Sequence, residues 1–305
     1  MVPSVEPIAS AAVSSNPFSS LFGAASLLHA QSPLSPRSGA TTYDNVTDFS
    51  YAGRAAIGEG SRPLGEIDSF QARVGCVSAW PLNPDTTLLA GVGAQWFEFH
   101  PPAGSPVPER LGCFSLKLGV NRQLGPAWSL RIEADPGIYS DFAGNGGDFG
   151  APVALRFVYA ASRELQWVVG VNYDWRSGHP LLGGVGVRWQ FAPDWTLAFL
   201  LPAPRVDWAV TKNFGLFAGA SLRGGTFRVA DNFGRIRGRP ELDQQIVDYR
   251  EIAFGAGARW QLSPATALHL AVGRMLDRRF EFHDRNLLLN GDGAATGQLT
   301  ITRVF

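Results

Sequence analysis

The sequence predicts an all-β protein, a transmembrane antiparallel up-and-down β-barrel of about fourteen strands, with about twelve as the alternative. Three observations lead to this prediction: alternation of apolar and polar residues, connections that are alternately short and long, and aromatic residues gathered near strand ends. No run in the chain approaches the roughly 18 apolar residues that a membrane helix needs. A chain of this kind that spans a bilayer must therefore do so with strands.

Each predicted strand is a run of alternating residues bounded by residues that favour turns. The stretch 181–201 shows this clearly, because Trp189 and Trp195 lie on apolar faces on either side of an Ala-Pro-Asp turn. In chain order the predicted strands are 46–57, 67–80, 86–99, 110–123, 127–140, 150–161, 165–175, 181–191, 194–201, 204–211, 214–229, 247–262, 266–281 and 293–305.

The connections between these strands fall into two kinds. The short ones are NPD, LGPA, SREL, APD, KN and SPAT, whereas the long ones include GEGSRPLGE, HPPAGSPVPE, AGNGGDFG, DNFGRIRGRPELDQQI and HDRNLLLNGDG. Short turns on one side and long loops on the other are typical of outer-membrane barrels. A soluble sandwich has no reason to sort its connections in this way.

Residues 1–43 are predicted to lie outside the barrel, which covers 44–305. The segment Phe18 to Ser32 contains a short apolar run and a small residue, Ala30, as at the end of an export signal, but no Lys or Arg precedes it. Residues 1–43 are therefore either the remnant of an export signal or a disordered tail.

Aromatic residues are expected to form a belt at each membrane interface, where amphipathic rings are favoured. The belt beside the short turns is predicted to contain Trp80, Trp128, Trp167, Trp189, Trp195, Trp260 and Phe305. The belt toward the long loops is predicted to contain Trp96, Phe99, Tyr139, Tyr173 and Trp175.

Charged residues of both signs fall on the strand face opposite to the apolar one. Arginine or lysine facing lipid at the midplane costs about 2 to 4 kcal/mol, so these side chains are expected to line an aqueous lumen. They are Arg73, Lys117, Arg131, Glu133, Asp135, Arg156, Asp174, Arg188, Arg205, Asp207, Glu251 and Arg259. About fourteen strands give a backbone radius of roughly 14 Å, and hence a lumen about a nanometre wide unless the tail or a loop fills it. We expect Arg131, Arg188 and Arg205 to determine selectivity.

Two resemblances add to this interpretation. The segments 201–229, 247–273 and 277–282, the last of which reads DRRFEF, resemble an uncharacterised outer-membrane β-barrel family of Gram-negative-type bacteria, a domain of unknown function. This implies the barrel fold and a location in the outer membrane, but no activity. The final segment, GQLTITRVF, resembles the C-terminal recognition strand of outer-membrane proteins, although Arg303 stands where an aromatic residue is usual. This second resemblance implies the barrel-assembly machinery as a partner, besides outer-membrane lipid.

The composition limits the function classes. Basic and acidic residues are equal at 26 each, which argues against a nucleic-acid partner. Cys76 and Cys113 fall on predicted strands separated by a third, so we expect two unpaired thiols. The five histidines are dispersed, and we predict no catalytic residue, no metal site and no cofactor.

A channel or passive pore for small polar solutes is the favoured function, although the sequence does not identify the solute. The alternative is a structural or interaction barrel with a plugged lumen, which binds a partner through the loop 230–246. An outer-membrane hydrolase is the least favoured, since only Ser177 and His179 near Asp174 suggest one.

Overall fold

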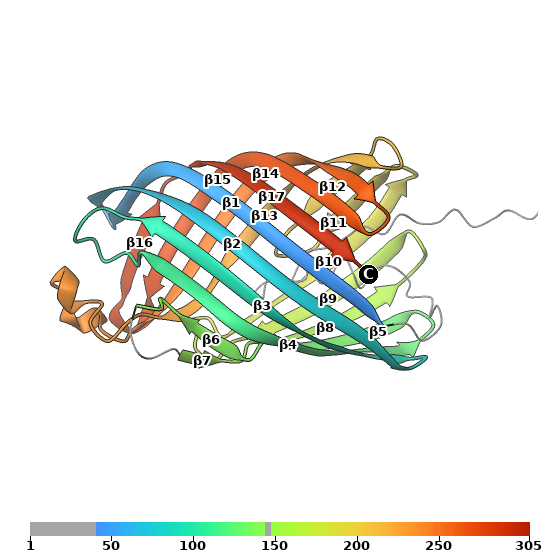
Figure 1. Cartoon of the computed structure of the whole chain (residues 1–305), viewed down its shortest axis with the longest axis horizontal. Helices are drawn as coiled ribbons and strands as arrows, with labels where there is room; N and C mark the ends of the chain where they lie inside the picture. The colour runs from blue at the N-terminus through green and yellow to red at the C-terminus, as the bar shows by residue number, and fades with distance from the viewer. Residues whose placement is uncertain (1–40, 144–147) are drawn as a thin grey trace, which may run out of the picture.

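A single closed β-sheet forms the protein, for which a computed structural model describes residues 41–143 and 148–305 (Figure 1). The ladder contains seventeen segments. These segments form fourteen strands of the barrel wall. β5 and β6 together form one such strand, as do β7 and β8, and β16 and β17. β1 pairs with β2 on one side and with β17 on the other, which closes the barrel. The prediction of about fourteen antiparallel strands is confirmed.

The strands are β1 (Thr42–Glu59), β2 (Arg62–Asn83), β3 (Thr86–His100), β4 (Arg110–Gly125), β5 (Trp128–Ala134), β6 (Gly137–Ser140), β7 (Asp148–Gly150), β8 (Val153–Ala160), β9 (Leu165–Tyr173), β10 (Leu181–Ala192), β11 (Trp195–Phe199), β12 (Arg205–Ala209), β13 (Phe214–Arg228), β14 (Ile246–Ser263), β15 (Thr266–Phe282), β16 (Leu287–Gly291) and β17 (Ala295–Val304). The described residues contain three 3₁₀ turns: η1 (Arg235–Arg237), η2 (Pro240–Leu242) and η3 (His283–Arg285). The first strand begins at Thr42, and the predicted export signal or disordered tail falls almost entirely outside the described residues. No helix in the described ranges is long and apolar enough to cross a membrane.

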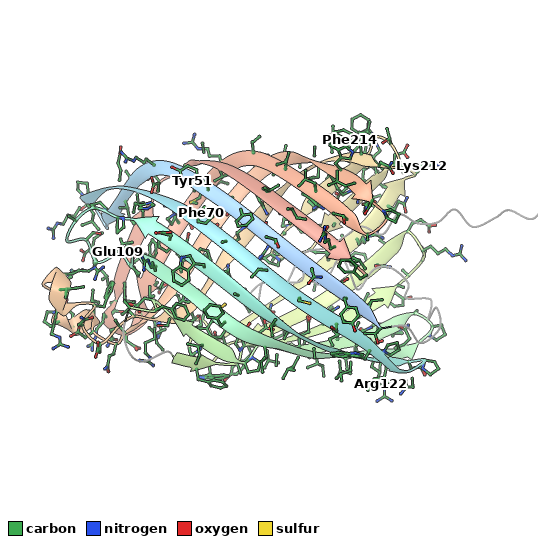
Figure 2. The ribbon with its side chains drawn as sticks, viewed as in Figure 1. Tyr51, Phe70, Glu109, Arg122, Lys212 and Phe214 are labelled. Atoms are coloured by element: carbon green, nitrogen blue, oxygen red, sulfur yellow. The ribbon has the colours of Figure 1, made fainter. Side chains whose placement is uncertain are left out.

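The outer surface of the barrel is apolar. Along β4, Phe114 and Leu116 are 59% and 52% exposed, whereas the side chain of Lys117 between Leu116 and Leu118 is 12% exposed. Figure 2 shows Tyr51 and Phe70 on the outside of neighbouring strands. Successive strand residues point to opposite faces, so apolar residues outside and polar residues inside follow from the sequence alternation.

The aromatic residues predicted beside the short turns are all exposed on the outside. They are Trp80, Trp128, Trp167, Trp189, Trp195, Trp260 and Phe305. The second predicted belt needs a correction, because Phe99 and Tyr139 are only 2% and 1% exposed. Both rings point into the barrel, where they belong to a packed core.

This core, which we call the aromatic plug, fills the long-loop end of the barrel. Phe97, Phe99 and Tyr249 pack against one another, with ring centroids 4.9 Å apart for Phe97–Tyr249 and 5.0 Å apart for Phe99–Tyr249. The other members are Ile57, Ile67, Val107, Leu111, Cys113, Tyr139, Phe227, Val229, Ala230, Phe233, Val247, Leu242, Phe280, Phe282, Leu287 and Leu289. The inward-facing strand residues at this end are therefore largely apolar.

Two connections contribute to the plug from outside the strands. Val107 comes from the β3–β4 loop, and Phe233 and Leu242 come from the β13–β14 loop that carries η1 and η2. In Figure 1 these turns lie at the end of the barrel opposite to the C-terminus. The end of β6 also reaches β13, where Ser140 pairs with Arg228. The wall therefore closes around the plug with fewer strands than it has elsewhere.

The strands of the barrel wall are shorter on one side. β11 and β12 have five residues each, whereas β10 and β13 on either side have 12 and 15. Their connecting turn contains Pro202 and Pro204, which lack the N–H needed to extend a ladder. The carbonyl oxygens of these prolines accept hydrogen bonds of 2.8 and 2.9 Å from Leu222 and Ala220 of β13.

Close strand approach makes Gly91 a sensitive position. A Cβ there would lie 2.0 Å from the carbonyl oxygen of Cys76 and 2.8 Å from the Cα of Val77. We expect Gly91→Val to lower the free energy of unfolding by about 1 to 3 kcal/mol through overpacking. Urea unfolding of vesicle-inserted protein, followed by tryptophan fluorescence, measures this. Gly297→Val is the control, since a Cβ at Gly297 meets no atom within 4 Å, and an equal loss in both variants would contradict the explanation.

Candidate functional site

A cavity of about 200 Å³ lies inside the barrel, beside the aromatic plug on the side of the short turns. Strands β1, β2, β12, β13, β14, β15 and β17 contribute to its wall, together with the β11–β12 turn. The wall is mixed in character: Ser50, Gln71, Arg73, Ser221, Glu251 and His269 are polar, whereas Phe217, Leu222 and Met275 are apolar.

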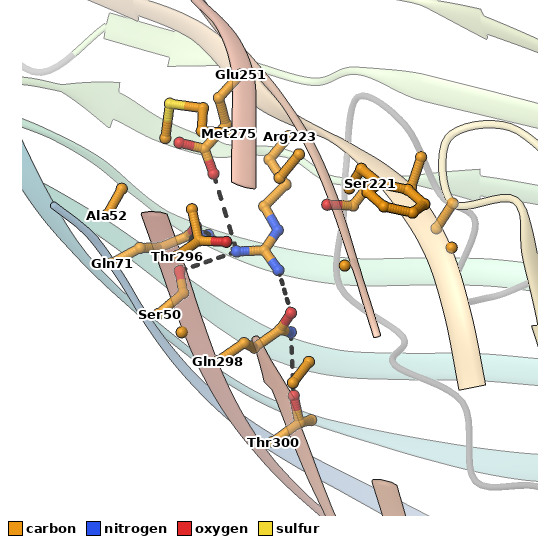
Figure 3. Close-up of a pocket in the computed structure, with 18 of the residues that line it drawn as sticks. Ser50, Ala52, Gln71, Ser221, Arg223, Glu251, Met275, Thr296, Gln298 and Thr300 are labelled. Atoms are coloured by element: carbon orange, nitrogen blue, oxygen red, sulfur yellow. Dashed lines mark hydrogen bonds and ion pairs between the residues drawn. The ribbon is translucent and has the colours of Figure 1, made fainter. Parts of the chain in front are cut away.

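Arg223 is the centre of the polar wall (Figure 3). Its Nη1 donates hydrogen bonds to Ser50 Oγ at 2.9 Å and to Gln71 Oε1 at 3.3 Å, and its Nη2 donates to Gln298 Oε1 at 2.5 Å. Glu251 Oε1 lies 3.8 Å from Nη1. A guanidinium group held by four side chains presents a fixed positive charge to the cavity.

A polar layer separates this cavity from the aromatic plug. The phenol of Tyr249 belongs to the plug but donates a hydrogen bond of 2.6 Å to Glu251 Oε2. Arg278 is 1% exposed and donates to Ser69 Oγ at 2.6 Å. These hydrogen bonds give partners to buried polar side chains at the boundary between the aromatic plug and the cavity.

Toward the short turns, three arginines share one carboxylate, a group we call the arginine cluster. Arg205 forms a bidentate ion pair with Asp207 and lies over the ring of Phe217, with 4.5 Å between its Cζ and the ring centroid. Arg188 and Arg259 also interact electrostatically with Asp207. Neither has a hydrogen bond to a carboxylate within the part of the chain that the structure describes. The cluster therefore carries an excess of positive charge.

The opposite wall pairs its charges more completely. Glu133 accepts hydrogen bonds from Arg131, at 2.7 Å, and from Arg156. Lys117 Nζ lies 2.7 Å from Asp135 Oδ2. These ion pairs hold the carboxylates against the wall, so they neutralise much of the positive charge there.

Comparison with known proteins gives a family. Residues 97–288, more than half of the chain, match the model of DUF6268, a domain of unknown function. The chain belongs to the DUF6268 family. No match was found among curated proteins.

Solved structures share the fold of this DUF6268 protein at low sequence identity. An outer-membrane channel from Pseudomonas putida F1 gives a TM-score of 0.53 at 10% identity, covering 88% of this chain and 98% of that chain. A deltaS2S3 mutant of the TodX monoaromatic hydrocarbon channel also gives 0.53 at 10% identity, with 92% and 94% covered. Likeness at this identity establishes the barrel fold. A closed barrel with an apolar outer face and aromatic residues at its rim is a protein of the bacterial outer membrane.

The DUF6268 barrel places nearly all the predicted lumen residues at inward, buried or half-buried positions. These are Arg73, Lys117, Arg131, Glu133, Asp135, Arg156, Arg188, Arg205, Asp207, Glu251 and Arg259. Asp174 differs, because it lies beyond the end of β9 in the β9–β10 loop and pairs with Arg176 at 2.9 Å. β9 ends at Tyr173, two residues earlier than the alternation suggested, so Asp174 belongs to the long-loop end and not to the wall.

Sequence reasoning missed two members of the polar wall, Arg223 and Asp48. Arg223 has the same parity on β13 as Gly219, which faces inward. Alternation could therefore have predicted that Arg223 faces inward. Asp48 alternates with the outward-facing Phe49 and accepts hydrogen bonds of 2.5 Å from both Gln298 and Thr300. Its partners lie at the other end of the chain and could not be inferred from local pattern.

The geometry around Ser177, His179 and Asp174 does not support the outer-membrane hydrolase. Ser177 Oγ donates to Asp248 at 3.1 Å, and the backbone N–H of His179 donates to Ser177 Oγ at 3.2 Å. Asp174 is occupied by Arg176. Within the described residues, no group of three or more His, Cys, Asp or Glu side chains could hold a metal ion. Cys76 and Cys113 are free.

Proposed function

We propose that this protein is an outer-membrane channel for small polar solutes, that it favours anions, and that the aromatic plug closes it in this conformation. The observation that carries the proposal is the charge of the inward-facing wall, where cations outnumber carboxylates. The cations are Arg73, Lys117, Arg131, Arg156, Arg188, Arg205, Arg223, Arg259 and Arg278, and the carboxylates are Asp44, Asp48, Glu133, Asp135, Asp207 and Glu251. Rings of fixed charge determine the ion preference of a pore.

The fold supports a transport role without identifying a solute. The solved structures of similar fold include outer-membrane channels. The polar wall around Arg223 and the arginine cluster suit a hydrated, negatively charged or hydrogen-bonding solute. Axial passage needs the aromatic plug to move, since its rings occupy the lumen from wall to wall at the long-loop end.

A closed interaction barrel is the second candidate, and the sealed end is the observation that favours it. The β13–β14 loop packs Phe233 and Leu242 into the plug but leaves Ile236 68% exposed. In that case the loop, and not the lumen, would act on a partner. Outer-membrane lipid and, during insertion, the barrel-assembly machinery acting on β17 remain the proposed partners in either case.

Refolded full-length protein in planar bilayers, with asymmetric potassium chloride, tests the proposal. We expect infrequent conductance steps whose reversal potential shows anion preference. Heat-modifiable gel mobility establishes that the barrel is folded. A folded barrel that passes no current under any applied voltage, and that permits no swelling of vesicles by small sugars or organic anions, would favour the interaction barrel instead.

A further inference from the structure

The β13–β14 loop, residues 230–245, folds on itself into a compact unit. The side chain of Asp243 accepts hydrogen bonds from the backbone N–H groups of Gly234 and Arg235, at 2.8 and 3.0 Å, and from Arg235 Nε at 2.7 Å. The N–H of Arg239 donates to the carbonyl oxygen of Gly234 at 2.8 Å. Because both partners of each bond belong to the loop, these bonds persist when the loop moves as one body.

A closed base joins this loop to the sheet. The N–H of Gln244 donates to the carbonyl oxygen of Ala230 at 3.0 Å, which holds the two ends of the loop together. Two further hydrogen bonds connect the base to its surroundings, from the N–H of Ala230 to Asp141 Oδ2 at 2.8 Å and from Arg228 Nη1 to the carbonyl oxygen of Gln244 at 2.6 Å. A base closed in this way can act as a hinge without unfolding of the loop.

Two ion pairs tie the far part of the loop to neighbouring connections. Arg239 Nη2 lies 2.9 Å from Glu59 Oε1 at the end of β1, and Arg237 Nη2 lies 3.4 Å from Glu109 Oε1 in the β3–β4 loop. Figure 2 shows Glu109 at this end of the barrel. The side chain of Glu109 is 71% exposed, and those of Glu59 and Arg239 are 28% and 31% exposed. Ion pairs with this much exposure are weak, so they hold the loop without fixing it.

The buried part of the loop shows what these ion pairs control. Phe233 and Leu242 are 3% and 1% exposed, and the ring of Phe233 stacks on that of Phe282 with centroids 6.0 Å apart. The guanidinium Cζ of Arg237 lies 4.2 Å from the centroid of the Phe233 ring. The arginine that pairs with Glu109 therefore also covers the ring that the loop inserts into the aromatic plug.

We propose that the β13–β14 loop is a lid, which swings about its base as one body and withdraws Phe233 and Leu242 from the aromatic plug when the ion pairs to Glu59 and Glu109 break. A rise in ionic strength weakens both ion pairs and therefore favours the open lid. This inference names the regulation of the conduction proposed above and rests on it for the effect on current. The motion of the lid itself is measurable without any current.

Cysteine labelling measures the lid in the refolded full chain. Leu242→Cys is placed in a background of Cys76→Ser and Cys113→Ala, and its reaction with a water-soluble maleimide in detergent micelles is followed by mass spectrometry. A buried thiol reacts only while the lid is open, so the rate follows the open population. Glu59→Gln with Glu109→Gln, the latch variant, removes both ion pairs. We expect it to accelerate labelling about 2- to 30-fold, since each exposed pair contributes a factor of about 1.4 to 5.

Three controls separate the lid from a general loosening. Glu241→Gln removes a carboxylate 3.7 Å from Arg239 that belongs to the loop itself, and we expect it to leave the labelling rate unchanged. Native Cys113, a plug member on β4, reports on the wall in chains that retain Leu242, and we expect the latch variant to leave it unreactive. Potassium chloride should accelerate labelling of Leu242→Cys when both ion pairs are intact, but not in the latch variant.

The outcomes separate this inference from the proposed function. Acceleration below about twofold in the latch variant would overturn the lid. Equal acceleration in Glu241→Gln would assign the effect to the charge of the loop, and equal acceleration at Cys113 would mean that the whole plug loosens. In planar bilayers, faster labelling without current would support the lid and refute the channel, whereas more frequent steps with unchanged labelling would refute the lid alone. Phe233→Cys repeats the measurement if Leu242→Cys lacks heat-modifiable mobility.

Discussion

Removal of the aromatic plug is expected to turn infrequent steps into a large, steady conductance. The change combines a shortened β13–β14 loop, in which residues 232–243 are replaced by two glycines, with Phe97→Ala, Phe99→Ala and Tyr249→Ala. The loop contributes Phe233 and Leu242, and the three rings pack against one another across the lumen. Phe227 and Phe280 remain on the wall, but they lose the rings of Phe97, Phe99 and Tyr249 that they contact.

The stability cost of this variant is part of the prediction. Each buried Phe→Ala replacement in a packed core costs about 3 to 5 kcal/mol, so the long-loop end loosens. The closed ladder below it does not use these side chains, and we expect the barrel to keep its heat-modifiable mobility. Phe114→Ala, Leu118→Ala and Phe254→Ala together make the same number of side-chain truncations on the outer face and form the control for them, which we expect to leave conductance unchanged. Wild-type conductance from a folded plug variant would show that the block lies elsewhere.

Charge reversal in the arginine cluster is expected to invert the ion preference. Arg188 and Arg259 share Asp207 with Arg205, so they contribute positive charge that no carboxylate of their own offsets. Arg188→Glu with Arg259→Glu, made in the plug-free background so that current is measurable, should move the reversal potential from anion toward cation preference. The neutral pair Arg188→Gln and Arg259→Gln should give an intermediate value.

Arg122→Glu provides the matched control for this experiment. Arg122 is exposed and lies at the short-turn end of the barrel (Figure 2), with a parity opposite to that of the inward Lys117. It should change the reversal potential little, because salt screens an exposed charge outside the lumen within about 10 Å at 0.1 M. An unchanged preference in both cluster variants would assign selectivity to another part of the wall, such as Arg131 or Arg156.

Local alternation was sufficient for the wall of this barrel. Because side chains of a strand alternate between two faces whatever the strand pairs with, the inward positions of Arg188, Arg205 and Arg259 followed from counting residues. The same rule placed Trp189 and Trp195 outside. Alternation failed where a strand ended early, at Asp174, and where the environment of a face changed along a strand, at Phe99 and Tyr139.

The sequence by itself determined the fold class, the face of most wall residues and the order of short and long connections, since all three are local properties of the chain. The tertiary structure decided what fills the barrel. Phe233 and Leu242 reach the plug from a loop, and Arg223 meets Ser50, 173 residues away, only because the sheet closes on itself. Pro202 and Pro204 indicate from the sequence where the ladder of β11 and β12 ends. Which strands β10 and β13 pair with beyond that point depends on the tertiary structure, because no local pattern specifies it.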